Sequence, residues 1–250
     1  LLTDQDEDGS HIKGLLFNLF QSLWPELFRM PEFTKSMLTP LVKVTHNKTK
    51  KVTSFYNLSD YDAWNESTEN GKGYSIKYYK GLGTSTPKEA KEYFREFKMV
   101  NYVFEPQKSD AAIELAFNKK KADSRKKWLS TYDRNEVLDY KSSEVTHTDF
   151  INRELKHFSN SDNRRSIPSM VDGLKTSQRK ILYCAFKKKL KHEIRVAQFA
   201  GYVSENGGYH HGEASLQGAI VNMAQDFVGS NNINLLEPIG QFGSRIMGGA

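Results

Sequence analysis

The chain has 250 residues, of which 38% are hydrophobic and 26% are charged. This composition is typical of a globular protein with one large or two ordinary domains, and it excludes a disordered chain. The single cysteine excludes an internal disulfide framework and fits a reducing compartment, and no apolar run approaches the length of a membrane span.

The positive charge is concentrated in the middle of the chain. The formal net charge is +6, yet residues 119–195 hold 20 of the 36 lysines and arginines and only 10 of the 30 acidic residues. A basic block in a chain that also has an acidic turn indicates a polyanionic partner such as nucleic acid. The common alternative is a solvated lysine face.

An acidic turn near the start of the chain has the clearest chemistry. Asp4, Asp6 and Asp8 alternate between a short apolar start and the apolar run at residues 14–20. The pattern predicts the end of a buried strand, an acidic turn and a helix capped by Ser10. Carboxylates so close together would repel one another, and a hard divalent cation such as Mg²⁺ removes that cost.

Two other interpretations of the acidic turn are open to test. Asp-x-Asp-x-Asp-Gly matches the start of a calcium EF-hand loop, but the twelfth position, which needs a bidentate glutamate, is Leu15. The helix that should precede such a loop is also missing. A solvated acidic turn that only caps the helix is the second alternative, and the turn by itself does not exclude it.

Short strands and helices are predicted between residues 41 and 97. Residues 41–45 and 51–56 alternate like strands around a hairpin turn at 47–50, and residues 74–79 form another strand. A short polar helix and loop are expected at 61–73. Thr86 caps a helix that opens with Pro87 and runs to about residue 97.

The turn that begins at Lys80 contains two glycines, which let backbone approach a phosphate closely. It lacks the GKS or GKT ending of a P-loop, and by itself it is better explained as an ordinary strand-to-helix turn. A helix at residues 111–122 then ends in Lys119, Lys120 and Lys121, where lysines favour the helix dipole. Residues 123–148 are polar and are predicted to connect two domains.

Helices and turns dominate after residue 148. An amphipathic helix at 149–158 precedes a basic loop at 163–168, and a turn at 172–173 leads into a strong helix at 175–190. One side of that helix carries Ile181, Leu182, Ala185 and Phe186, and another carries Lys180, Lys187 and Lys191. One buried face and one basic face behind a short turn favour a helix-turn-helix that binds DNA, with an amphipathic surface helix as the alternative.

The stretch at residues 200–213 contains adjacent histidines. The i, i+4 spacing of zinc ligands is absent, so Tyr209, His210 and His211 are expected to hydrogen-bond phosphates or to order a loop. An apolar helix is predicted at 214–227. Cys184 lies in the helix at 175–190 and is expected to be a buried structural thiol.

Several stretches resemble the signatures of one family and occur in that family's order. Residues 4–14, DQDEDGSHIKG, resemble the second acidic motif of the metal-binding TOPRIM domain of type II DNA topoisomerases. The others are KYYKGLGTS at 77–85, RSIP at 165–168, VDGLK at 171–175 with QRK at 178–180, and YHHGE at 209–213. The resemblance covers essentially the whole chain and is closest to the eukaryotic enzymes. Thr176-Ser177 departs from the family's common Pro-Gly, so the start of that helix is expected to differ slightly.

The resemblance implies an α/β part followed by a mainly α part. A TOPRIM domain with a Rossmann-like parallel sheet is expected at 1–122, a connector at 123–148 and a winged-helix domain at 149–250. The implied activity changes DNA topology by a transient double-strand break through a phosphotyrosyl link, with Mg²⁺ held by Asp4, Asp6 and Asp8. The DNA contacts that we expect are Lys80, Lys119, Lys120, Lys121, Arg164, Arg165, Lys175, Arg179, Lys180, Tyr209, His210 and His211.

Other implied partners are double-stranded DNA and a second copy of the chain in a homodimer, with ATP bound outside this chain and a nuclear location. The family's first TOPRIM glutamate would precede Leu1 and its nucleophilic tyrosine would follow Ala250, so no tyrosine is nominated and the piece alone is expected to be inactive. Two alternatives remain: part of a TOPRIM nuclease, which would not need the basic helix, and a non-catalytic DNA-binding module.

Overall fold

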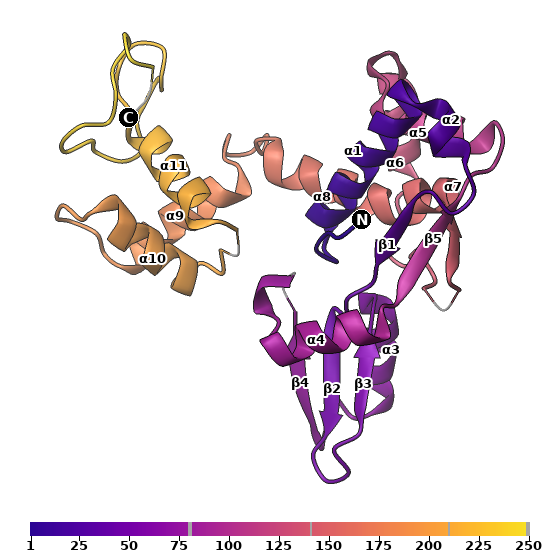
Figure 1. Ribbon diagram of the computed structural model, residues 1–250. Coiled ribbons are helices and arrows are strands. Elements are labelled where there is room, and N and C mark those ends of the chain that lie inside the picture. Colours follow the sequence, from indigo (N-terminus) through magenta and orange to yellow (C-terminus); the bar gives the residue numbers. More distant parts are fainter. Residues whose placement is uncertain (80–81, 141, 210, 249–250) are drawn as a thin grey trace. The chain divides into compact units, whose positions relative to one another are not determined.

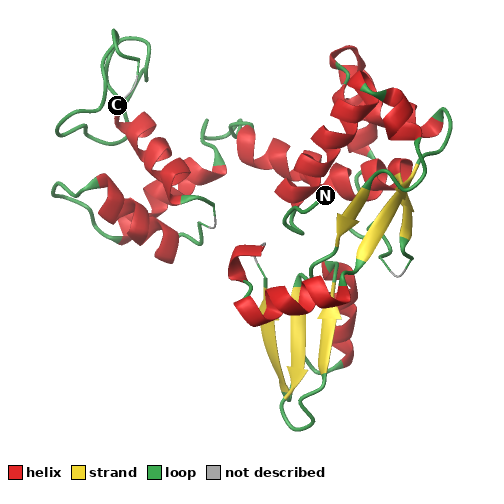
Figure 2. Ribbon diagram, in the orientation of Figure 1, coloured by secondary structure: helices red, strands yellow, loops and turns green. Residues whose placement is uncertain are grey.

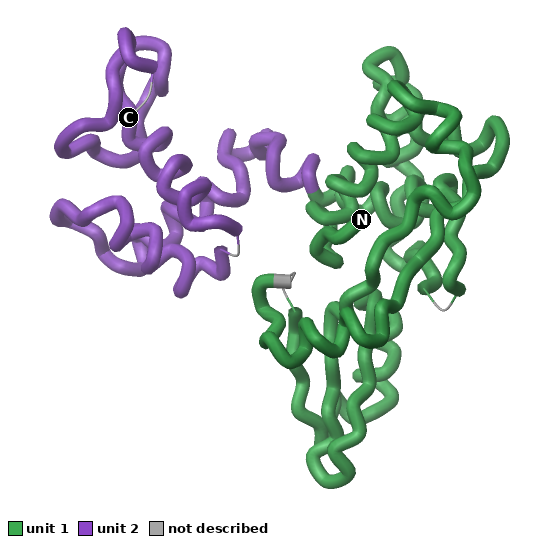
Figure 3. Tube along the Cα trace, in the orientation of Figure 1, with its two compact units in different colours: residues 1–161 green, residues 162–250 purple. Residues whose placement is uncertain are grey.

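The computed structural model describes residues 1–79, 82–140, 142–209 and 211–248. The chain divides into two compact units, residues 1–161 and residues 162–250 (Figure 3). Every strand of the described residues lies in the first unit (Figure 2). The elements of that unit are α1 (Glu7–Leu23), α2 (Pro25–Arg29), β1 (Lys35–Met37), β2 (Val42–His46), β3 (Val52–Phe55), α3 (Leu58–Ser67), β4 (Tyr74–Tyr78), α4 (Pro87–Glu96), β5 (Met99–Val103), α5 (Lys108–Phe117), α6 (Ala122–Ser130), β6 (Glu144–Thr146), α7 (His147–Phe150) and the start of α8 (Lys156–Ser166).

A mixed sheet of order β1-β5-β6 carries the main core of the first unit. β1 pairs antiparallel with β5, and β5 pairs parallel with β6. Leu1 lies beside β1: its nitrogen donates to the carbonyl of Lys35 at 2.5 Å, and its carbonyl accepts from the amide of Met37 at 3.0 Å. Bonds from one residue to two positions that flank a third are the pattern of a parallel pair. The chain therefore enters the acidic turn along a sheet, as the sequence predicts.

Phe17 of α1 is fully buried at the centre of this core. Its ring lies 4.9 Å from that of Tyr102 on β5, and 5.0 Å from both His147 and Phe150 on α7. Aromatic rings bury large areas and prefer such edge-on contacts, so one residue joins α1 to the sheet and to α7. This packing fixes the helix that carries the acidic turn.

A second, antiparallel sheet of order β3-β2-β4 has two different faces. Val42 and Val44 are fully buried on the face that packs with residues of α3. Lys43 and Lys77 are paired across β2 and β4, and they reach Glu92 and Glu89 of α4 at 3.6 and 2.8 Å. Figure 1 shows α4 in front of the strands and α3 behind them. Alternation along a strand thus assigns an apolar face to one helix and a polar face to the other.

The second unit consists of the end of α8 and three further helices, α9 (Thr176–Lys187), α10 (Val196–Asn206) and α11 (Glu213–Ala224), which all contact one another. Ile181, Phe199 and Leu216, one from each helix, form its core with Cys184, which is fully buried. Burial raises the pKa of that thiol, so Cys184 is a structural residue, as predicted. Over residues 162–209 and 211–248 no strand is present, so the wing of a winged helix is absent from this part of the unit.

Three sequence expectations differ from the structure. The sheets of the described residues are not a parallel Rossmann-like sheet: β5–β6 is the one parallel pairing between their strands, because the short turn between β2 and β3 forces those strands to run antiparallel. The division falls at 161/162 instead of 148/149, because Phe150, Ile151 and Leu155 belong to the first core. The connector predicted at 123–148 contains α6 and β6.

Candidate metal-binding turn and basic surfaces

The acidic turn leads directly into α1. Asp6 is the N-cap of the helix, and its Oδ1 accepts the amide of Gly9 at 2.8 Å. The predicted cap, Ser10, is instead buried inside the first turn. Asp4 and Asp6 are exposed, whereas Asp8 is half-buried in the first turn of α1. Acidic side chains at this end complement the positive end of the helix dipole.

The turn fits a metal site that is completed by other ligands. Across the described ranges, no group of three or more His, Cys, Asp or Glu side chains converges on one metal position. Mg²⁺ is usually held by one or two carboxylates together with waters and substrate phosphates, and Asp4 and Asp6 can supply two exposed carboxylates. The set of Asp4, Asp6 and Asp8 as three ligands therefore stays a prediction.

Behind the turn lies a buried ion pair that the sequence did not predict. Lys13, whose side chain is 1% exposed, donates from Nζ to Oε1 of Glu154 at 2.6 Å. Burial alone would raise the pKa of Glu154, but the Lys13 ammonium and the hydrogen bonds from Lys13, Ser10 and Tyr140 hold it below its usual range. The one signal in the sequence is a lysine inside an amphipathic helix, and it does not identify the partner.

The three predicted lysines at 119–121 are exposed on a 3₁₀ turn, Lys119–Lys121, between α5 and α6. The predicted helix at 111–122 is interrupted here, because Asn118 takes an extended backbone and its Oδ1 accepts the amide of Lys120 at 2.9 Å. Arg125 donates to the carbonyls of Leu115 and Asn118 and so fixes the turn. The result is an ordered, exposed basic surface.

Four predicted basic residues lie near the start of the second unit. Arg164 and Lys175 are exposed, and α8 continues through the region predicted to be a basic loop. Arg165 pairs with Asp162 at 3.1 Å. The Arg179 guanidinium donates two bonds to Asp172, at 2.9 and 3.0 Å. A bond from the Leu174 amide, followed by Arg179, lowers the pKa of the Asp172 carboxyl. Arg179 therefore orders the turn before α9.

The loop after α10 is tied to α9. Lys180 donates from Nζ to the carbonyl of Gly208 at 2.6 Å, which brings this predicted residue next to the predicted Tyr209. Tyr209 is 8% exposed in the core of the second unit, with its ring centroid 5.5 Å from that of the exposed His211. Tyr209 thus orders the loop, one of the two roles predicted for it. Lys80 and His210 lie outside the described residues.

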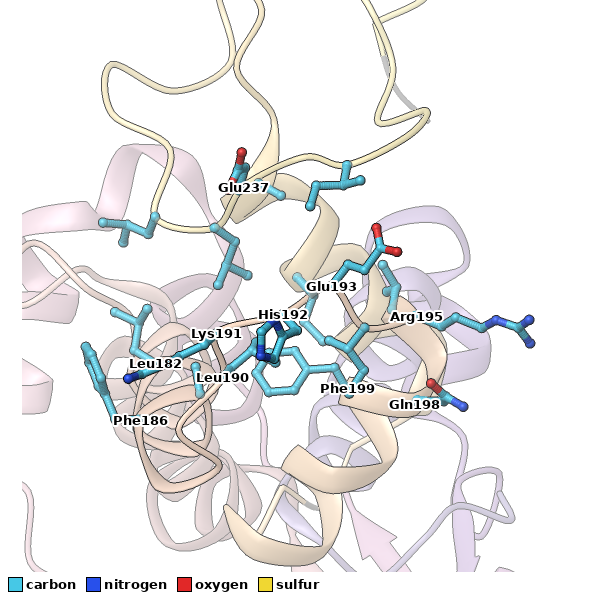
Figure 4. A pocket seen from close by; sticks show the side chains of 18 of the residues that line it. Leu182, Phe186, Leu190, Lys191, His192, Glu193, Arg195, Gln198, Phe199 and Glu237 are labelled. Atoms are coloured by element: carbon cyan, nitrogen blue, oxygen red, sulfur yellow. The ribbon is translucent and has the colours of Figure 1, made fainter.

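An apolar hollow of about 890 Å³ is present elsewhere in the second unit (Figure 4). Leu182, Leu190 and Phe199 line it, with Arg195 and Glu237 at its rim, and none of the predicted DNA contacts takes part. Phe186 is also part of its lining but is 78% exposed, so its predicted burial is wrong. The buried side of α9 is formed by Ile181 and Cys184 instead.

The acidic turn at the start of a helix and the exposed lysines define a class of protein that binds a polyanion with the help of a cation. Residues 37–163 match the family profile of the C-terminal associated domain of TOPRIM, and residues 165–250 match the family profile of DNA gyrase/topoisomerase IV. The chain therefore belongs to the type II DNA topoisomerase family, and its relatives are of the eukaryotic type.

Sequence and structure comparisons agree. The chain is 56% identical to DNA topoisomerase 2 of Arabidopsis thaliana over 252 residues and 52% identical to DNA topoisomerase 2-alpha of Homo sapiens over 263 residues. All of this chain is aligned in both cases, but it spans only 17% of the length of each of these curated relatives. The crystal structure of the Plasmodium falciparum topoisomerase II DNA-binding, cleavage and re-ligation domain is similar with a TM-score of 0.76 and 48% identity, covering 99% of this chain and 34% of that one.

Proposed function

We propose that this chain is part of the DNA cleavage and religation core of an ATP-dependent type II topoisomerase. The observation that carries the proposal is the Plasmodium domain, which is named for DNA binding, cleavage and re-ligation and aligns with nearly the whole chain. In this proposal the first unit includes the TOPRIM part and the second unit is of the winged-helix type. The substrate is double-stranded DNA, and the whole protein is a nuclear homodimer whose ATP site lies outside this chain.

Asp4 and Asp6 are proposed to hold Mg²⁺, with Asp8 as a further ligand or as a residue that orients the turn. The ion, when bound, would stabilise charge on the phosphate and on the leaving oxygen during strand cleavage. Lys119, Lys120, Lys121, Arg164 and Lys175 are exposed and are proposed to bind backbone phosphates, which positions a duplex without reading its sequence. None of the helices in the described residues is long and apolar enough to cross a membrane.

The metal site is tested by DNA binding with and without a divalent cation. Titration of Mg²⁺ or Ca²⁺ into this chain with a nicked duplex is expected to tighten binding, because the cation joins the acidic turn to a phosphate. The Asp4→Ala, Asp6→Ala variant is expected to lose that tightening completely. Fluorescence anisotropy of a labelled duplex measures both affinities.

A matched variant separates the site from its charge. Asp62→Ala, Glu66→Ala removes two exposed carboxylates from α3 and changes the net charge equally, so its metal response should equal that of the parent. If the parent and the Asp4, Asp6 variant bind DNA identically with and without metal, the acidic turn is not a working metal site. The chain would then act as a non-catalytic DNA-binding module under these conditions.

The basic surface at 119–121 predicts a salt effect. The affinity of a protein for B-DNA falls with salt by a slope of about −0.9 for each phosphate that it neutralises. Replacing Lys119, Lys120 and Lys121 by alanine is therefore expected to reduce the slope of log K against log salt by about 3. The control replaces Lys48, Lys50 and Lys51, exposed lysines at the hairpin, and should leave the slope unchanged. Equal slopes in the two variants would remove 119–121 from the DNA contacts.

A further inference from the structure

Glu154 is a buried carboxylate whose contacts all point toward α1 or support it. It lies in the π-helical turn Ile151–Leu155, where Ile151 and Leu155 are core residues. Oε1 accepts from Ser10 Oγ at 2.5 Å and from Lys13 Nζ at 2.6 Å, and Oε2 accepts from the hydroxyl of Tyr140. Ser10 and Lys13 are one turn apart on α1 and about 140 positions from Glu154 in the chain, so the contacts hold two distant segments together.

We propose that Glu154 is the positioning residue of the acidic turn: it fixes the first turn of α1 through Ser10 and Lys13, and thereby the carboxylates that receive the divalent cation. The cation is part of the proposed function, so this second half of the inference rests on it. The first half, that Glu154 holds the turn, does not depend on any metal.

Ser10 is the link between Glu154 and the candidate ligands. Its amide donates to the carbonyl of Asp6 at 3.0 Å, and its hydroxyl lies 3.1 Å from the same oxygen. The hydroxyl has a single hydrogen, and the shorter, charge-assisted bond to Glu154 takes it. Asp6 is held a second time where its Oδ1 accepts the amide of Gly9. A shift of Ser10 therefore shifts both the backbone and the carboxylate of Asp6.

Glu154 also controls where the charge of Lys13 goes. An ammonium that is 1% exposed needs a partner, because an unpaired buried charge is very costly. The acidic turn carries carboxylates at positions 4, 6, 7 and 8, which compete for any free cation nearby. By pairing with Lys13, Glu154 leaves these carboxylates to an external ion. Groups that orient metal ligands in this way typically change metal affinity about 10–100-fold when they are removed.

The test uses two double variants that both lack the buried ion pair. Lys13→Met, Glu154→Gln keeps an oxygen that can accept from Ser10, whereas Lys13→Met, Glu154→Leu removes it. Replacing both members of a buried pair avoids leaving one charge unpaired, so both proteins should fold. The comparison between them isolates the hydrogen bond to Ser10.

Two measurements are made on each protein. Amide hydrogen exchange at Gly9 and Ser10 should be about tenfold faster in the leucine variant and close to the parent in the glutamine variant, with Val100 in the core unchanged. Mn²⁺ affinity, measured from the EPR signal of the free ion, should be about 10–100-fold weaker in the leucine variant and little changed in the glutamine variant. Lys156→Met is the control, because Lys156 is buried two positions further on and donates to Thr131 instead of α1.

Each outcome decides one half of the inference. Parent-like exchange at Gly9 and Ser10 in the leucine variant overturns the positioning role, whatever the metal does. Faster exchange with unchanged Mn²⁺ affinity overturns the link between positioning and metal. If the parent itself binds no Mn²⁺, the metal site of the proposed function fails, while the exchange data still support or overturn the role of Glu154 in holding the turn.

Discussion

Replacing Gly9 by alanine is expected to destabilise the first unit by about 3 kcal/mol or more, the upper range for forcing extra atoms into a packed site. A Cβ at this position would lie 1.9 Å from the carbonyl oxygen of Asp4 and 2.8 Å from its carbon. Both obstacles are backbone atoms, so no side-chain rotation relieves the overlap. Either α1 or the segment at Asp4 has to move, and both are anchored, the helix by Phe17 and the segment by Leu1.

Urea denaturation followed by tryptophan fluorescence measures this loss. The three tryptophans of the chain, Trp24, Trp64 and Trp128, all lie in the first unit and report on it alone. Gly218→Ala is the control: no atom lies within 4 Å of its added Cβ in α11, and alanine inside a helix should stabilise the second unit by about 0.5–1 kcal/mol. A Gly9→Ala protein with parent-like stability would show that the turn at Asp4 adapts freely.

If the variant stays folded, its metal response becomes informative. The displaced segment carries Asp4, whereas Asp6 remains tied to α1 as its cap. The two candidate ligands would then be moved apart, and the tightening of DNA binding by Mg²⁺ should weaken as it does in the Asp4, Asp6 variant. Gly9 is thus needed for the geometry of the turn, not only for the start of the helix.

Local sequence signals predicted the elements whose cause is local. The β2–β3 hairpin and α4, with its Thr86 cap and Pro87, lie where the alternation and the cap residues place them. The start of α1 was displaced because Asp6 and Ser10 are both good cap residues. What decides between them is Glu154, which engages the Ser10 hydroxyl from 144 positions away. No pattern within the first twenty residues contains that information.

Long-range packing also explains the boundary that was predicted too early. The helical stretch at 149–158 has an apolar face, and periodicity alone does not say which core receives it. Phe150, Ile151 and Leu155 fill the core around Phe17, so the stretch belongs to the first unit. For the candidate site, residue types identified the acidic turn and the lysines at 119–121. They did not show that Arg179 is engaged by Asp172, because an ion pair across a turn depends on its folded geometry.

Acidification is expected to remove about 3 kcal/mol of stability from the first unit through one residue, His147. This imidazole is fully buried, and burial lowers its pKa from 6.5 to about 4, against the opposing bond to Val103. The carbonyl of Val103 can only accept, so Nδ1, 3.0 Å away, carries the hydrogen. Nε2 of the neutral ring then accepts from the hydroxyl of Thr34 at 3.2 Å. The ring is therefore built into the core in its uncharged form.

The sign of the effect follows from proton binding. Between pH 6.5 and about 4 the unfolded chain holds a proton on His147 that the folded chain does not, so stability falls as pH falls through this window. A difference of about 2.5 pKa units corresponds to about 3 kcal/mol at 1.36 kcal/mol per unit. Above pH 6.5 both forms are neutral and the full stability is retained.

Urea denaturation between pH 7 and pH 4.5, followed by tryptophan fluorescence, checks the prediction. His147→Gln should flatten the dependence, because its amide can donate to Val103 and accept from Thr34 but does not titrate. His192→Gln, an exposed histidine of the second unit, should leave the profile of the parent unchanged. Since His147 packs against Phe17, the same acidification that charges this ring loosens the helix that carries Asp6 and Asp8. Loss of metal-dependent DNA binding at low pH should therefore be smaller in His147→Gln than in the parent when both are compared at pH 5.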